Sequence, residues 1–252
     1  MRKIRIWILA VLFAVPMSII GQDAPKMYWV HEDQVKPSMI MEYEKSAKQL
    51  VENCQKHNIQ TLGWITTATN DHRYLYVSPI SSMADINYDG FDPLVEAMGE
   101  EAFGQMFSDM DKCYTSHGDY IIVLNEELTY MPEGFTQTPE GEDYRRFYYI
   151  NTTPEHNGML KEKMKAIKEF YASKSSKVHY RVYQSGFGTM GNYYMVAVAS
   201  KDGISFETMG EENRSLLGDE RHQVFSDMMK YVTSIEEVTG MMRRDLAYSP
   251  KQ

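Results

Sequence analysis

Two stretches decide the fold: FSDMDKCYTS at residues 107–116 and FSDMMKYVTS at residues 225–234. Seven of the ten positions are identical, and the mixed composition means that low complexity does not explain the match. Similarity at a fixed spacing within one chain is typical of a duplicated structural unit. The sequence therefore predicts two copies of one fold within 252 residues.

Each copy contains the same succession of predicted strands and helices, in the order βαββαβ. The first copy has strands at 27–32, 59–67, 74–80 and 120–128, a helix through Tyr43, Ala47, Leu50 and Cys54, and a second helix through Phe107 and Met110. The second has strands at 147–151, 178–184, 193–200 and 238–246, a helix through Leu160, Met164, Ile167 and Tyr171, and another through Phe225, Met228 and Val232. Even the exits agree, because LTYMP at 128–132 recurs as LAYSP at 246–250.

A βαββαβ unit forms an antiparallel sheet with both helices on one face, and two such units can cover each other's bare faces. In this element order and repeat symmetry, residues 27–248 resemble the dimeric α+β barrel superfamily, with two ferredoxin-like units fused in one chain. The resemblance implies an α+β fold of two ferredoxin-like repeats packed sheet to sheet. It also implies a range of activities, since the superfamily includes small monooxygenases, haem-handling proteins and dehydratases.

The N-terminal residues are typical of an export signal. Residues 1–21 have a basic start, an apolar run from Ile6 to Ile20 and a small residue, Gly21, at the expected cleavage point. An uncleaved membrane anchor is the alternative. We expect a signal peptide at 1–21, one repeat at 22–131, a linker rich in Pro, Gly and acidic residues at 132–146, and the second repeat at 147–252, in a periplasmic or secreted protein.

The charge balance limits the classes of partner. The formal net charge is −9, and no patch rich in Lys or Arg follows the N-terminal segment. An acidic chain of this kind is not expected to bind nucleic acid or anionic lipid. No stretch after residue 21 is apolar enough to predict a membrane span, so we expect no stable membrane insertion once the signal peptide is removed. We also expect a monomer or a weak homodimer.

Strand alternation predicts a pocket between the two sheets. If Tyr28, Val30, Tyr148 and Ile150 face the helices, the residues between them face the opposite sheet. Aligning 59–64 with 178–183 adds a second set to this face. The candidate ligand-binding residues are Trp29, His31, Trp64, Tyr149, Asn151, His179, Arg181 and Tyr183, an aromatic set with a few polar groups, as small-molecule pockets have. Solvent exposure or structural hydrogen bonding of these polar residues is the alternative.

Metal and cofactor chemistry lacks a defining motif. His31 or His179 could bind haem or another metal, but the chain has no His-x-x-x-His or Cys-x-x-Cys-His spacing. Residues 85–96 match a calcium-loop pattern through Asp85, Asn87, Asp89 and Glu96. A strand precedes this loop, however, so the pattern favours a turn in which Asp92 caps the next helix and Pro93 follows. The cofactor is left unknown.

The chain has two cysteines, Cys54 and Cys113, and no Gly-x-Ser-x-Gly nucleophile motif. Both cysteines fall on apolar helical stripes, near the ends of antiparallel helices, so their Cα atoms should be too far apart for a disulfide. We expect two buried free thiols.

These patterns favour an exported protein that binds, and could turn over, a small apolar or aromatic ligand between its sheets. The alternative function is that of a non-catalytic cell-envelope protein that contacts a protein partner and binds no small ligand. A monooxygenase-like enzyme is the third, and it is implied by the resemblance alone.

Overall fold

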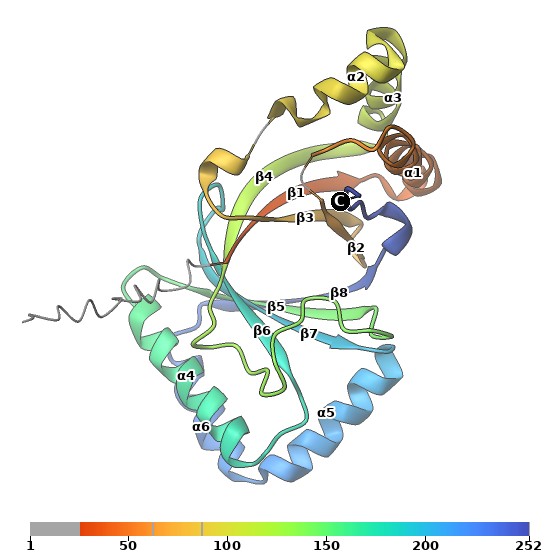
Figure 1. Ribbon diagram of the computed structural model, residues 1–252. Coiled ribbons are helices and arrows are strands. Elements are labelled where there is room, and N and C mark those ends of the chain that lie inside the picture. The colour runs from red at the N-terminus through yellow and green to blue at the C-terminus, as the bar shows by residue number, and fades with distance from the viewer. Residues whose placement is uncertain (1–25, 62, 87, 252) are drawn as a thin grey trace, which may run out of the picture.

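The structure is a computed structural model that describes residues 26–61, 63–86 and 88–251. The expected signal peptide at 1–21 lies outside the described residues. The remaining chain forms a barrel of eight strands with one layer of helices on each side, as Figure 1 shows. The fold class and the resemblance to dimeric α+β barrels are thus confirmed.

The first repeat places its helices on one side of the barrel (Figure 1). Its elements are β1 (Met27–Val35), the short 3-10 helix η1 (Pro37–Met39), α1 (Ile40–His57), β2 (Ile65–Thr69), β3 (Arg73–Ile80), η2 (Met83–Asp85), η3 (Tyr88–Phe91), α2 (Asp92–Met98), α3 (Glu100–Asp111) and β4 (Tyr114–Leu124).

The second repeat has the same order on the other side. Its elements are β5 (Tyr144–Thr152), α4 (Asn157–Ser173), β6 (Tyr180–Ser185), β7 (Asn192–Ser200), α5 (Gly203–Leu217), α6 (Glu220–Met229), β8 (Ser234–Met242) and η4 (Arg244–Leu246).

Several boundaries differ from the sequence-based expectation. The last strand of each repeat lies earlier than predicted, at 114–124 instead of 120–128 and at 234–242 instead of 238–246. The second helix of each repeat is two helices, broken at Gly99 and Gly218, whose positive φ angles of 84° and 65° suit glycine. The second strand begins only at Ile65, rather than at residue 59. The linker ends sooner than predicted, because β5 begins at Tyr144.

Both sheets have the ferredoxin-like strand order, and they join at their edges in a closed barrel ordered β1-β3-β2-β8-β5-β7-β6-β4. Antiparallel seams link β2 to β8 and β4 to β6. At the first seam Gly240 pairs with Thr69. A Cβ atom there would lie 2.8 Å from Cγ2 of Thr67 and 3.2 Å from the carbonyl oxygen of Ala68, so the close approach of the strands depends on glycine.

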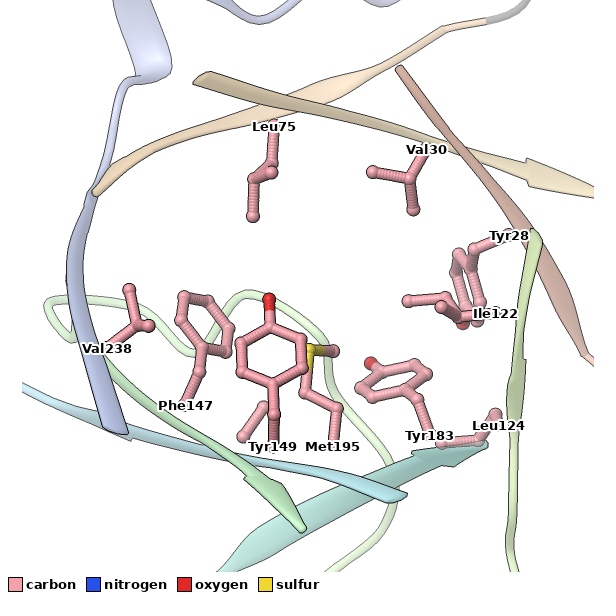
Figure 2. Close-up of a cluster of buried hydrophobic side chains, with 11 residues drawn as sticks. Tyr28, Val30, Leu75, Ile122, Leu124, Phe147, Tyr149, Tyr183, Met195 and Val238 are labelled. Atoms are coloured by element: carbon pink, nitrogen blue, oxygen red, sulfur yellow. The ribbon is translucent and has the colours of Figure 1, made fainter. Parts of the chain in front are cut away.

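Apolar side chains from both repeats fill the barrel. Figure 2 shows Val30 and Leu75 of the first repeat pointing toward Tyr149 and Tyr183 of the second. The complete cluster is Tyr28, Val30, Leu75, Ile122, Leu124, Phe147, Tyr149, Tyr183, Met195, Ala197 and Val238. Because the two sheets share this core, neither can expose its inner face without loss of the other's packing.

The duplicated phrase lies at the end of α3 and of α6, where Met110 and Met228 are buried as predicted. Its aspartates face solvent and make the same contacts in both copies. Asp109 accepts hydrogen bonds from Lys112 and Gln105, at 2.6 and 3.0 Å. Asp227 accepts from Lys230 and Gln223, at 2.6 and 3.1 Å. The repeated Asp therefore orders a Lys at each helix end, where a positive charge is favourable.

The repeated exits cross between the repeats. Leu128 and Tyr130 leave the first repeat and pack under the helices of the second, where the Tyr130 hydroxyl donates to the Ser176 carbonyl at 3.1 Å. Leu246 and Tyr248 leave the second repeat and pack under the helices of the first. We call residues 128–130 and 246–248 the exit segments. Each completes the core of the other repeat.

Candidate functional site

The structure brings only part of the predicted pocket together. Tyr149, Arg181 and Tyr183 face the barrel interior, as expected. The expectation that Trp29, His31 and Trp64 share this face is wrong. The inward-facing residues of β1 are instead Tyr28 and Val30, so the alternation of this strand is opposite to the predicted one.

Trp29, His31 and Trp64 instead lie on the outer side of the first sheet, which the helices cover. The indole of Trp29 donates to Asp119 at 2.9 Å, and Nδ1 of His31 lies 3.0 Å from the same carboxylate oxygen. Trp64 packs under α1 against Cys54 and Tyr248, and its indole donates to the Leu246 carbonyl at 2.8 Å.

The last two candidates lie near strand ends. The ring of His179, just before β6, lies 5.9 Å from that of Tyr130, in the exit segment on the helix side. Asn151 is half-buried near the end of β5, and its amide donates to the Tyr149 carbonyl at 3.3 Å. Neither belongs to the lining of the interior cavity.

The barrel interior contains a buried pair of arginines, Arg145 and Arg181, beside a cavity of about 50 Å³. Most of their hydrogen bonds go to backbone carbonyls of the linker; Arg181, for example, donates to Thr136 at 2.9 Å and to Gln137 at 3.1 Å. Burial, together with the charge of Arg181, lowers the pKa of Arg145 to about 10. The linker thus closes this end of the barrel. The remaining space suits one or two waters and is too small for an aromatic ligand.

A far larger cavity, about 510 Å³, lies between the outer face of the second sheet and helices α4, α5 and α6. Figure 1 shows α4 and α6 together, with α5 running apart from them across the sheet. The floor comes from the four strands of the second repeat, including Tyr148, Ile150, Val196 and Val198. The roof includes Met164, Tyr171, Phe206, Met209, Phe225 and Met228. Its size falls within the range of small-molecule sites.

Polar groups enter this cavity at a few points. Arg146 of β5 is bonded to Glu207 at 2.9 Å and to Glu237, and its guanidinium lies 4.5 Å from the centre of the Phe206 ring. Its Nε atom is buried and has no hydrogen-bond partner among the described residues. A buried donor without a partner is unfavourable, so this N–H is a ready contact for a ligand oxygen.

Tyr148 and Tyr171 are two of the three tyrosines that line the same space. Burial raises the pKa of Tyr148, and the positive charge of Arg146 offsets part of that effect. Burial also raises the pKa of Tyr171, against a hydrogen bond with Asn213 that lowers it. Both phenols are therefore protonated at neutral pH and can donate or accept a hydrogen bond.

Sequence reasoning missed this cavity because no single motif produces it. Its signal is the number of methionines on facing helices, since flexible thioether side chains are common at adaptable binding surfaces. Met164, Met209, Met228 and Met229 all line it.

The calcium-loop pattern lies only partly within the described residues, because Asn87 and the side chain of Asp89 fall outside them. Asp85 instead caps its own turn, accepting from the backbone amides of Ser81 at 2.6 Å and Ser82 at 3.0 Å. Glu96 lies on α2. The predicted capping role of Asp92 is wrong: it is the first residue of α2 and follows the N-cap Phe91, and no side-chain capping hydrogen bond forms there among the described residues. An acidic residue in the first turn still suits the helix dipole.

Both cysteines are buried free thiols, as predicted. Cys54 belongs to the cluster under α1 and α2, and Cys113 to a separate cluster with Val35 and Met110. Burial raises the pKa of Cys54 to about 11, which is the opposite of what a nucleophilic thiol needs.

Comparisons with known proteins agree on architecture. No family sequence model matches the chain, and no curated protein sequence matches it. Among solved structures, an anthrone oxidase-like protein has a TM-score of 0.57 at 16% identity, covering 88% of this chain and 93% of its own. A monooxygenase-like protein of Fusobacterium nucleatum has a TM-score of 0.52 at 13% identity, covering 87% and 93%. A mutant chlorite dismutase of Candidatus Nitrospira defluvii has a TM-score of 0.52 at 11% identity, covering 87% and 92%.

Within residues 26–61, 63–86 and 88–251, no helix combines the length and apolar character needed to cross a membrane. At these identities the matching structures bear on the fold alone, and they span nearly the whole of it. The chain therefore has the architecture of the dimeric α+β barrels, with both halves of the barrel supplied by one polypeptide.

Proposed function

We propose that this protein binds a small apolar or aromatic molecule bearing a neutral oxygen acceptor, in the cavity beneath α4, α5 and α6. The observation that carries the proposal is a largely apolar cavity of about 510 Å³ with the unpartnered Nε–H of Arg146 in its wall. This moves the expected ligand from between the two sheets to the helix side of the second sheet.

The ion pairs of Arg146 favour an uncharged ligand over an anionic one. Glu207 and Glu237 already neutralise its guanidinium, so an added anion would meet two carboxylates as well as one arginine. A carbonyl or hydroxyl oxygen can accept from Nε–H without that repulsion. Aromatic and methionine side chains then contact the apolar body of the ligand.

The anthrone oxidase-like neighbour suggests a suitable probe. Anthrone has three fused rings and one ketone oxygen, which is the combination of shape and acceptor that this cavity favours. The name of that neighbour supports the choice of anthrone as a probe molecule.

Haem fits the cavity less well. Haem iron is usually held by His, by Cys thiolate, or by a His and Met pair, with Tyr a rarer ligand. The described lining contains no His and no Cys, and burial raises the pKa of its tyrosines, which keeps their phenols protonated. We therefore assign no haem chemistry to this site.

The test is titration of the protein with anthrone, followed by calorimetry. Two variants address the cavity: Met209→Trp fills it, and Arg146→Met removes the donor. The matched control is Ala197→Val, because Ala197 lies on β7 between Val196 and Val198 but faces the barrel interior. Each variant is checked for wild-type folding by circular dichroism.

We expect one site per chain, loss of binding in Met209→Trp, weaker binding in Arg146→Met and unchanged binding in Ala197→Val. Loss of one hydrogen bond to a charged donor should weaken binding by about tenfold or more. Binding lost in Ala197→Val and kept in Met209→Trp would return the ligand to the barrel interior. Oxygen uptake with conversion of anthrone to anthraquinone and water, above that of a protein-free control, would mark the protein as an oxygenase-like enzyme.

We also propose that the protein is exported after cleavage of residues 1–21, as the basic and apolar pattern of that segment suggests. The mass of the protein recovered from the periplasm or culture medium of an expressing bacterium tests this. A mature chain that begins near Gln22 is expected, and full-length protein in the cytoplasm would contradict it.

A further inference from the structure

A ladder of histidine and aspartate side chains lies on the outer face of the first sheet. His31 and Asp33 are two residues apart on β1 and so point to the same side. Their cross-strand partners on β4 are Asp119 and His117, respectively. Two adjacent antiparallel pairs thus bring four ligand-type side chains together.

Three of them converge. One ligand atom from each of His31, Asp33 and His117 lies within 4.8 Å of the other two. Oδ1 of Asp33 is 3.3 Å from Nε2 of His31, but this buried oxygen accepts no hydrogen bond among the described residues. Asp33 is only 2% exposed, so this carboxylate oxygen lies in the protein interior with the His31 ring beside it but with no hydrogen bond among the described residues.

The groups behind these three residues hold them in place. Asp119 contacts Nδ1 of His31 at 3.0 Å, which directs Nε2 toward Asp33 and His117. The Tyr43 hydroxyl donates to Oδ2 of Asp33 at 2.5 Å and leaves Oδ1 as the inward oxygen. Trp29 donates to Asp119 at 2.9 Å. A carboxylate behind a ligating imidazole, with a hydrogen bond behind a ligating carboxylate, is the usual support of a protein metal site.

We propose that His31, Asp33 and His117 bind a divalent first-row transition metal ion, with Asp119 and Tyr43 as positioning residues. Two imidazoles and one carboxylate suit Zn²⁺, Co²⁺, Ni²⁺ or Cu²⁺, whereas Ca²⁺ prefers a set of oxygens. Metal–ligand bonds of about 2.0–2.2 Å require the three atoms to come closer, so the exposed ring of His117, which stacks on Tyr114 with ring centres 5.3 Å apart, would turn further inward. Its exposure also leaves the remaining coordination positions to water.

The second repeat has no such ladder at the equivalent place. There, Ile150 of β5 pairs with Ile235 of β8, and both line the large cavity. The metal site is thus a property of the first repeat and is independent of ligand binding in the second.

The experiment is a Zn²⁺ titration of untagged, chelator-stripped protein in competition with a chromophoric chelator, followed by a Co²⁺ absorption spectrum. His117→Gln is the main variant, because this side chain is exposed and lies outside the buried core clusters of the first repeat. Asp119→Asn tests positioning, and His179→Gln is the matched control from the second repeat. Folding of each variant is checked by circular dichroism.

We expect one Zn²⁺ per chain in the wild type and in His179→Gln, and loss of this site in His117→Gln. Asp119→Asn should weaken affinity by about 10- to 100-fold. Excess Ca²⁺ should not compete. If the folded wild type shows no one-to-one binding, or if His117→Gln binds as the wild type does, the proposal is wrong and His31 is a protonated bridge between two carboxylates.

Discussion

Replacing Leu246 with alanine tests the crossing of the exit segments. Leu246 follows the last strand of the second repeat, yet it is fully buried against residues of the first, including Val35, Tyr43 and Met110. Its backbone carbonyl accepts hydrogen bonds from Trp64 and Thr66, both at 2.8 Å, and the substitution keeps that carbonyl. The change therefore removes packing alone.

The expected cost follows from complete burial. Leu→Ala substitutions in cores cost about 2–5 kcal/mol, and we expect about 3 kcal/mol for Leu246→Ala. In a domain of this size, each kcal/mol lowers the melting temperature by about 2–4 °C, so a decrease of about 6–12 °C is expected. Leu216→Ala is the control, because Leu216 on α5 is 46% exposed and its loss should change stability by less than about 0.5 kcal/mol.

Urea unfolding measures the total cost, and amide hydrogen exchange locates it. Protection should fall in α1 of the first repeat, although residue 246 belongs by sequence to the second. The mirror variant Leu128→Ala should reduce protection in α4 instead. If Leu246→Ala unfolds like Leu216→Ala, or if protection falls equally in α1 and α4, the crossing does not have the energetic role argued for it.

Three further predictions concern the seam, an ion pair and the thiols. Gly240→Val should cost about 1–3 kcal/mol, because its side chain would collide with Thr67 and Ala68 across β2 and β8. Gly104→Val on α3, where a Cβ meets nothing within 4 Å, should leave the stability unchanged or raise it by a few tenths of a kcal/mol, because Val has a higher helix propensity than Gly; equal thermal unfolding of the two variants would contradict this. Burial opposes ionisation of Glu44, but hydrogen bonds from Arg243 and Tyr74 lower its pKa below 4.5, so its stabilisation should be present above that pH and lost as the pH falls through the lowered pKa; denaturant titrations should show wild type and Glu44→Gln converging in acid, and a constant difference would refute the assignment. Thiol titration should find two groups in the denatured, unreduced protein and slow reaction in the native one, because Cys54 and Cys113 are buried; fast native labelling would contradict the packing.

The fold could be predicted because the repeat and the strand and helix periods depend on local sequence. In the second repeat, FYYIN at 147–151 separates the two faces of β5 correctly: Phe147 and Tyr149 face the barrel, and Ile150 faces the helices. In the first repeat, MYWVHEDQV carries polar residues on both faces. Glu32 lies on the inward side, where Tyr120 donates to it at 2.8 Å. Alternation alone therefore could not determine which face was inside.

The sites depend on distances that no local pattern contains. The large cavity results from the path of α5 relative to α4 and α6, and the His–Asp ladder results from the register of β1 against β4. The residue type of His31 makes it a candidate ligand from sequence, but only the pairing of β1 with β4 brings His117 to His31 and Asp33.

The exchanged exit segments make the two halves inseparable in the way that a domain-swapped pair is. A repeat expressed alone would lack the Leu and Tyr side chains that the other repeat's exit segment contributes to its core. Its own exit segment would have no core to pack into. Assembly is thus tied to a ratio of one to one, which fusion into a single chain guarantees. Apart from the exit segments, the sheet face under the helices of one repeat packs, among the described residues, only against that repeat's own helices. This face carries a cluster of His and Asp side chains in the first repeat and a large cavity in the second. The two repeats thus share one backbone architecture but differ in the chemistry of the face under their helices.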